Sequence, residues 1–78
     1  MKIKMLSEAE LEALLRTRPE LEDFWKSPST LLLIRSRPSR SDPIYELQLA
    51  YDLGDRLETF RWLWVDALQG EIINQFPP

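Results

Sequence analysis

The stretch that decides the fold is Ile44–Tyr51, which reads IYELQLAY. Its large apolar side chains, Tyr45, Leu47 and Leu49, alternate with polar ones, so they share one face of an extended chain. An alternation of period two is typical of a strand that packs one face against a core. We therefore expect a strand here, followed by a turn in the sequence DLGD, whose glycine can adopt a positive φ angle.

Three more segments around this stretch have strand character. Residues 30–36 hold the apolar run LLLI, residues 57–65 are rich in aromatic side chains, and residues 71–76 form the last apolar segment. Residues 37–43 contain two prolines among small polar residues, which indicates a loop. The connections between the later strands are short and favour antiparallel hairpins.

The first part of the chain predicts an amphipathic helix that is capped at Ser7. Glu10 follows three residues later, which is the spacing of a capping box, and leucines then repeat at helical spacing. Pro19 interrupts this pattern, while Thr17 and Glu20 repeat the capping-box spacing around it. We expect the helix to kink or restart at this point.

These elements predict a single α+β domain over residues 1–78. The N-terminal helix, kinked or not, packs on one face of a four-stranded antiparallel sheet, in the order α-β-β-β-β. The composition, 44% hydrophobic and 29% charged, is that of a folded chain. With neither cysteine nor histidine, the chain cannot form a disulfide, a zinc finger or a Ser-His or Cys-His catalytic arrangement.

Charge is unevenly distributed along the chain, whose net charge is −3. Residues 27–41 carry three arginines and no acid, whereas residues 42–78 carry seven acids and two arginines. An acidic C-terminal half argues against a nucleic acid as partner, because phosphate binding needs clustered cations. The short basic segment 35–41 lacks interleaved aromatic residues, so we interpret it as a solvated loop; an anionic partner surface is the alternative.

The segments Pro43–Leu49 and Val65–Ile73 together resemble the PepSY domain, whose typical stretches are a Tyr-Glu-Val-like strand and a Val-Asp-Ala-x-Thr-Gly-Glu-Val-like hairpin. Here the hairpin reads VDALQGEII, with Asp66 and Gly70 at the turn and Gln69 in place of the usual threonine. Asp66 can accept hydrogen bonds from turn amides, and Gly70 can adopt the left-handed conformation that closes the hairpin.

The PepSY resemblance implies a non-catalytic α+β module of the kind found in propeptides of secreted peptidases and in extracytoplasmic bacterial proteins. Such modules inhibit, chaperone or regulate a partner protein. No apolar segment of signal-peptide length follows the first residues, so the chain as written is expected to be cytoplasmic. An extracytoplasmic location is expected if it is an excised domain. A protease domain is absent from these residues.

The candidate site is the aromatic stretch 60–65, FRWLWV. In a regular strand Phe60, Trp62 and Trp64 point one way and Leu63 and Val65 the other, so both faces are apolar. The resemblance places the valine before Asp66 in the core, which puts the three aromatic side chains on the outer face. That face could instead be covered by Leu57 and nearby loops or by Lys2–Met5.

The aromatic face predicts a protein partner, since tryptophan and arginine are enriched at protein interfaces. The predicted partner-binding residues are Phe60, Arg61, Trp62, Trp64 and Arg35, with the edge of the last strand available for pairing. The alternatives are a small homodimer whose aromatic faces meet, and a small-ligand-binding domain. We expect no catalytic residue, cofactor or metal ion, and no insertion into a membrane.

Overall fold

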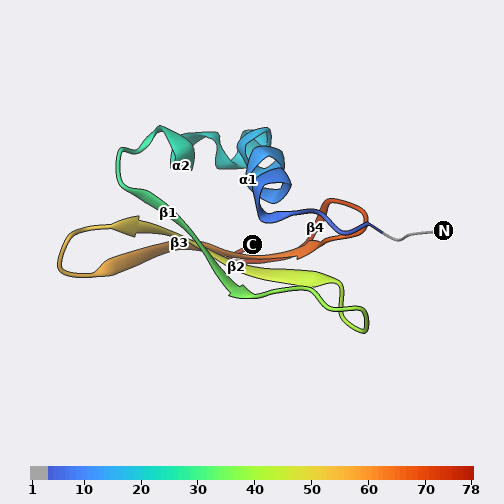
Figure 1. Ribbon diagram of the computed structural model, residues 1–78. Coiled ribbons are helices and arrows are strands. Elements are labelled where there is room, and N and C mark those ends of the chain that lie inside the picture. Colours follow the sequence, from blue (N-terminus) through green and yellow to red (C-terminus); the bar gives the residue numbers. More distant parts are fainter. Residues whose placement is uncertain (1–3) are drawn as a thin grey trace.

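Helices and then strands follow one another along the chain, as the sequence predicts (Figure 1). The computed structural model describes residues 4–78. In chain order the elements are α1 (Glu8–Arg16), the 3-10 turn η1 (Pro19–Leu21), α2 (Glu22–Lys26), β1 (Thr30–Ser36), β2 (Ile44–Asp52), β3 (Leu57–Asp66) and β4 (Glu71–Phe76). The four strands form one sheet in the order β1-β2-β3-β4, with every neighbouring pair antiparallel. The fold is therefore α+β.

Helix α1 begins with the predicted capping box. The Glu10 amide donates to Ser7 Oγ over 3.1 Å, and the Ser7 amide donates to Glu10 Oε1 over 2.9 Å. The second capping box, predicted at Thr17, does not form. Thr17 is instead the C-cap of α1, and its hydroxyl donates to the Leu14 carbonyl over 2.6 Å. The helix ends at Thr17 because Pro19 has no amide hydrogen to extend it, and η1 starts with Pro19 at its first position.

The two hairpin turns use the residues that the sequence singled out. At the β2–β3 turn, Gly54 has a φ of 91° and its amide donates to Asp52 Oδ1 over 2.9 Å. At the β3–β4 turn, Asp66 Oδ1 accepts from the amides of Leu68 (2.8 Å) and Gln69 (3.1 Å). Gly70 closes this turn with a φ of 69°, a conformation that other residues rarely adopt. The predicted roles of Asp66 and Gly70 in the hairpin are confirmed.

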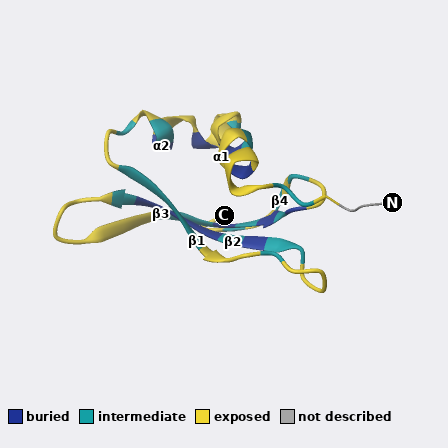
Figure 2. Cartoon of the chain, in the orientation of Figure 1, coloured by how far each residue is buried: buried dark blue, intermediate teal, exposed yellow. Residues whose placement is uncertain are grey.

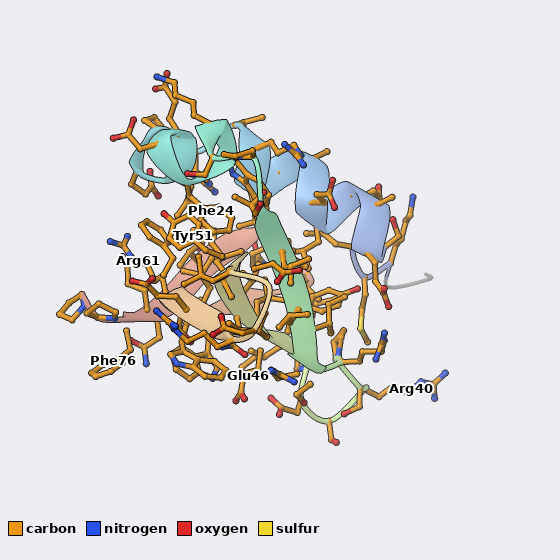
Figure 3. All side chains as sticks on the ribbon, turned by 90° about the vertical axis from the view of Figure 1, so that its left-hand side faces the viewer. Phe24, Arg40, Glu46, Tyr51, Arg61 and Phe76 are labelled. Carbon is orange, nitrogen blue, oxygen red and sulfur yellow. The ribbon has the colours of Figure 1, made fainter. Side chains whose placement is uncertain are left out.

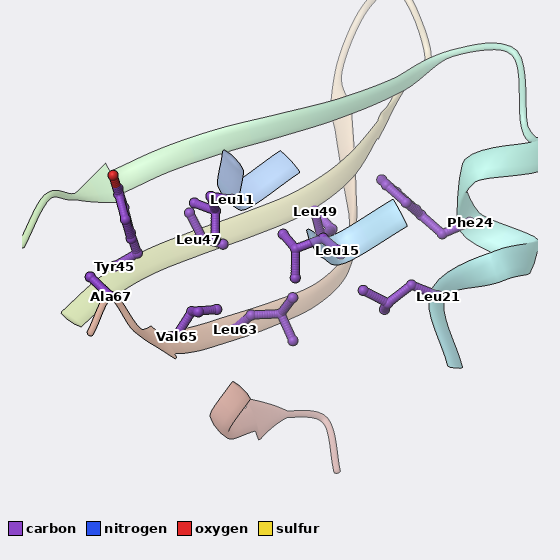
Figure 4. Packing of buried hydrophobic residues seen from close by; sticks show 10 residues of the cluster. All are labelled: Leu11, Leu15, Leu21, Phe24, Tyr45, Leu47, Leu49, Leu63, Val65 and Ala67. Carbon is purple, nitrogen blue, oxygen red and sulfur yellow. The ribbon is translucent and has the colours of Figure 1, made fainter. Parts of the chain in front are cut away.

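All helical elements lie on one side of the sheet, and the core fills the space between them and the strands (Figures 2 and 4). Side chains of α1, η1, α2 and the facing side of β2 and β3 are buried there. They are Leu11, Leu15, Leu21, Phe24, Tyr45, Leu47, Leu49, Leu63, Val65 and Ala67. The predicted inward face of β2 and the inward direction of Leu63 and Val65 are therefore confirmed.

Aromatic rings close one end of this core around Phe24 of α2. The Phe24 ring centroid lies 4.9 Å from that of Trp25, 5.3 Å from that of Tyr51 and 5.1 Å from that of Phe60. Phe24 itself has no exposed surface. Because α2 has only five residues, its position depends on these ring contacts more than on its own helical hydrogen bonds.

Hydrogen bonds hold the other end of the core together at Tyr45. The Tyr45 hydroxyl donates to the Leu6 carbonyl over 2.7 Å, and the Leu6 amide donates to the Ala67 carbonyl over 2.9 Å. The segment that leads into α1 is thus attached to both β2 and the β3–β4 turn.

The Tyr45 contact predicts a response to alkaline pH. Burial raises the pKa of Tyr45 above its ordinary value of 10.0, and the negative charge of Glu8 adds to the rise. A raised pKa means that the contribution of Tyr45 to stability is complete below about pH 10 and is lost as the pH rises through the folded-state pKa. In a Tyr51→Phe background, which leaves one phenol, we expect an ultraviolet titration midpoint above 10.

The same titration in denaturant is the control, because the unfolded chain should return the ordinary phenol pKa. A native midpoint at or below that of the unfolded chain would contradict the burial of the hydroxyl.

Candidate functional site on the uncovered sheet face

The side of the sheet opposite the helices is covered by no element within residues 4–78 (Figures 1 and 3). We call it the uncovered face, and strand register with side-chain alternation defines its members. They are Leu31, Leu33, Arg35 and Ser36 of β1, Ile44, Glu46, Gln48, Ala50 and Asp52 of β2, Leu57, Thr59, Trp62, Trp64 and Asp66 of β3, and Glu71, Asn74 and Phe76 of β4. In Figure 3, Glu46 and Phe76 lie on the side of the sheet away from Phe24.

An aromatic patch occupies the β3 and β4 half of this face. Trp62 lies opposite Phe76 of β4, and both point to the same side. Phe76 is 63% exposed, the largest exposed fraction among the exposed large hydrophobic residues, whereas Trp62 and Trp64 are partly buried. The predicted outward direction of the two tryptophans agrees with this register. Phe76 was not predicted, because its face depends on the pairing of β4 with β3.

The Trp64 side chain is held in place by a neighbour on β2. Its indole Nε1 donates to Glu46 Oε1 over 3.1 Å. The two residues lie opposite each other in the pairing of β2 with β3. This hydrogen bond fixes the orientation of the indole ring. It also gives the Glu46 carboxylate a protein partner in place of water.

A polar strip crosses the same face from β1 to β3. Arg35 donates to Gln48 Oε1 from Nε over 3.0 Å and from Nη2 over 2.6 Å. Gln48 Nε2 in turn donates to Thr59 Oγ1 over 2.6 Å. Gln48 is only 6% exposed although no element covers this face, since its neighbours on the strands enclose it. The predicted site residue Arg35 is therefore on the uncovered face, as part of a network that the sequence did not reveal.

Phe60 is not on this face, contrary to the sequence prediction, and the predicted partner-binding residue Arg61 is not on it either. The register of β3 shifts between Arg61, which pairs with Leu49, and Thr59, which pairs with Ala50. Phe60 is the extra residue of this β-bulge, so the strict alternation that the prediction assumed ends there. Phe60 stacks on Phe24 at 5.1 Å, on the covered side.

Arg61 follows Phe60 to the covered side of the sheet. Its Nη1 donates to Gln75 Oε1 over 2.9 Å, and its guanidinium carbon lies 5.0 Å from the Phe60 ring centroid. The five predicted partner-binding residues are thus split between two faces. Arg35, Trp62 and Trp64 share the uncovered face, whereas Phe60 and Arg61 lie on the other.

Neither of the suggested covers is seen over the uncovered face. Leu57 is 45% exposed, and Met5 packs against the core on the helix side. Lys4 is exposed and forms an ion pair with Glu10 of α1, with 3.8 Å between Nζ and Oε2, whereas Lys2 and Ile3 lie outside the described residues.

Carboxylates outnumber cations on the uncovered face. Its members include one cation, Arg35, and four carboxylates, Glu46, Asp52, Asp66 and Glu71. In the adjoining loop Arg37 turns away to Glu8 of α1, whose Oε2 accepts from Arg37 Nε over 2.7 Å. This hydrogen bond and the charge of Glu8 raise the pKa of Arg37. The predicted basic loop therefore does not add its charge to the face as a block.

The described part of the chain offers neither a cluster of metal ligands nor a membrane-spanning helix. Residues 4–78 contain no group of three or more acidic side chains placed to hold a metal ion. Among the same residues, no helix has the length and apolar character needed to cross a membrane.

Comparisons with known proteins add no relative. No family model matches the chain, and no curated protein or solved structure matches it significantly. The resemblance to PepSY domains therefore stays a prediction from the sequence.

The opposite placement of Phe60 and Trp62 predicts opposite mutational effects. Phe60→Ala removes a ring from the core and should lower the free energy of unfolding by about 3 kcal/mol. Trp62→Thr keeps a residue that favours strands and leaves the core intact, so its cost should be about 1 kcal/mol. Urea unfolding followed by circular dichroism measures both.

A larger loss of unfolding free energy in Trp62→Thr than in Phe60→Ala would contradict the placement of Phe60 in the core by the bulge. Leu63→Ala, at a fully buried position of the same strand, is the reference for a core substitution.

Proposed function

We propose that this chain is a non-catalytic protein-interaction module that binds a partner protein with its uncovered face. The observation that carries the proposal is the patch of Trp62, Trp64 and Phe76 on a sheet face that no described element covers. Contiguous exposed apolar surface on a small domain marks an interaction site more often than it marks a passive surface. Tryptophan side chains also dominate binding energies at interfaces.

A protein fits this face better than a small ligand does. The face is an extended strand surface, whereas small ligands bind in concave sites. A shallow pocket of about 390 Å³ lies elsewhere, between the α2–β1 connection and the β2–β3 hairpin, and Tyr51, Asp52 and Glu58 are among its lining residues. The aromatic patch is therefore suited to a second surface laid against it.

A protein also fits better than a nucleic acid. Arg35, the one cation among the members of the face, is engaged by Gln48, and Glu46 stands beside Trp64. Phosphate backbones require several unengaged cations along their path. The aromatic patch itself carries no charge, which favours a partner whose contact surface is apolar with a polar rim.

The predicted PepSY resemblance would make the partner a peptidase or another protein under regulation. That refinement rests on the sequence motif alone, whereas the uncovered face carries the general proposal.

Photo-crosslinking from the uncovered face tests the proposal. A photoreactive amino acid replaces Asn74, an exposed residue opposite Trp64, and the matched control replaces Glu20, an exposed residue of η1 on the helix side. In cells that naturally make the protein, we expect protein adducts from position 74 and few from position 20. Adding Trp62→Thr should reduce the adducts from position 74 at least fivefold.

Mass spectrometry of the adducts separates a foreign protein from a second copy of this chain. Equal adduct yields from the two positions, or an adduct unaffected by Trp62→Thr in the folded protein, would contradict the proposed use of the face.

A further inference from the structure

The two edges of the sheet differ in how well they are protected against pairing with another strand. β4 carries a bulge at Ile73, where the register with β3 shifts, and two prolines follow it directly. Its exposed positions include Glu71 and Asn74. Bulges, charges and prolines are the devices that keep an edge strand from pairing. The β4 edge is therefore protected, contrary to the sequence prediction that it is available for pairing.

The β1 edge has none of these devices over most of its length. The segment Thr30–Ile34 contains neither a charge nor a proline and pairs with β2 in regular register. The bulge of β1 comes only after it, at Arg35. On its other side β1 has no neighbour among the residues that the structure describes. Its four consecutive apolar side chains, 31–34, all remain partly exposed.

We propose that the β1 edge pairs with β1 of a second copy of this chain, antiparallel and about a two-fold axis. The two sheets would then join into one sheet of eight strands. Charge is the first argument for a second copy, because an uncharged segment meets itself without repulsion. Closure is the second: a two-fold contact uses both free β1 edges, and the protected β4 edges stop further growth. The expected assembly is a dimer and not a fibre.

The faces of the sheet fix the register of this pairing. Leu31 and Leu33 are on the uncovered face, whereas Leu32 and Ile34 pack toward the core. Residues that lie opposite each other in an antiparallel pair point to the same face, so core-facing residues must meet core-facing residues. Leu32 therefore lies opposite Leu32 of the second copy, or the strands shift by two residues.

Charge and length select the first of these registers. With Leu32 at the axis, Leu31 lies opposite Leu33 of the second copy and the whole segment Thr30–Ile34 pairs with itself. This register adds about four to six backbone hydrogen bonds. A shift of two residues one way places Arg35 opposite Leu31, and a shift the other way brings Pro28 into the pairing. The first of these shifts faces an arginine with a leucine at each end, and the second leaves a single apolar pair, Leu31 with Leu31.

The proposal is independent of the partner-binding role proposed above, since it uses the edge of β1 and not the aromatic patch. The two are compatible, because edge pairing keeps both uncovered faces on the same side. A dimer of this kind would double the area of uncovered face that is offered to a partner.

Sedimentation analysis over a wide concentration range tests the dimer. We expect a monomer–dimer equilibrium whose dissociation constant rises at least tenfold in Leu31→Lys, because two added charges would come close at the paired edges. Leu31 points away from the core, so this variant should remain folded, which circular dichroism checks. The matched control is Asn74→Lys, on the same face at the opposite edge, which should leave the equilibrium unchanged.

Disulfide trapping tests the register. The chain has no cysteine, so the introduced thiols are the only ones that can react. A protein with Leu31→Cys, mixed with a tagged protein that carries Leu33→Cys, should form the mixed disulfide under mild oxidation. Each alone should form little, because identical positions would be about 8 Å apart between Cα atoms, beyond the reach of a disulfide.

Three outcomes would overturn the proposal. They are a monomer at every concentration, equal disulfide yields from mixed and single proteins, and a dimer that persists in Leu31→Lys but dissociates in Trp62→Thr. The last outcome would assign self-association to the aromatic patch. A monomer that still gives foreign adducts from position 74 would leave the proposed function standing.

Discussion

A single helical layer covers one face of a sheet whose strand β3 carries large apolar side chains on both faces, and the rest of the structure depends on this constraint. Helix α1 has nine residues and α2 has five, enough to cross one face of a four-stranded sheet whose outer strands are about 14 Å apart. The layer is held at one end by the Phe24 rings and at the other by the Tyr45 hydroxyl on the Leu6 carbonyl. Because no second layer exists within the described residues, the apolar side chains of the opposite face remain available to other molecules.

Bulges decide which aromatic residues belong to which face. Without the bulge at Phe60, strict alternation would carry this ring to the side of Trp62 and remove the stacking partner of Phe24 at 5.1 Å. The extra residue instead returns Phe60 to the core and leaves Trp62 and Trp64 outside. A single aromatic stretch thus supplies both the core and the candidate interface. The helix α2, whose own hydrogen bonds are few, gains its position from the ring that the bulge redirects.

Local chemistry made much of this fold predictable from the sequence. The capping box of Ser7 and the turn roles of Asp66 and Gly70 depend on neighbours along the chain, so their residue types and spacing were sufficient. The position of Phe60 was not predictable, because a bulge is defined by the pairing of two strands and not by one strand's pattern. The network from Arg35 to Gln48 also joins residues that only the sheet brings together. The predicted capping box at Thr17 was wrong, because a threonine hydroxyl can cap either the start of the following helix or, as here, the end of the preceding one.

Hydrogen bonding on the uncovered face determines what a partner would gain by binding there. Gln48 has its amide oxygen bonded to Arg35 and its amide nitrogen to Thr59, so its polar atoms need no solvent and it can stay buried under a docked surface. Trp64 is already oriented by Glu46, which lowers the conformational entropy lost when a partner immobilises the ring. Phe76, at 63% exposed, has no such restraint among the described contacts and would lose more freedom on binding. The preordered part of the interface is therefore the centre of the face, around Trp64 and Gln48, and its adaptable part is the β4 edge.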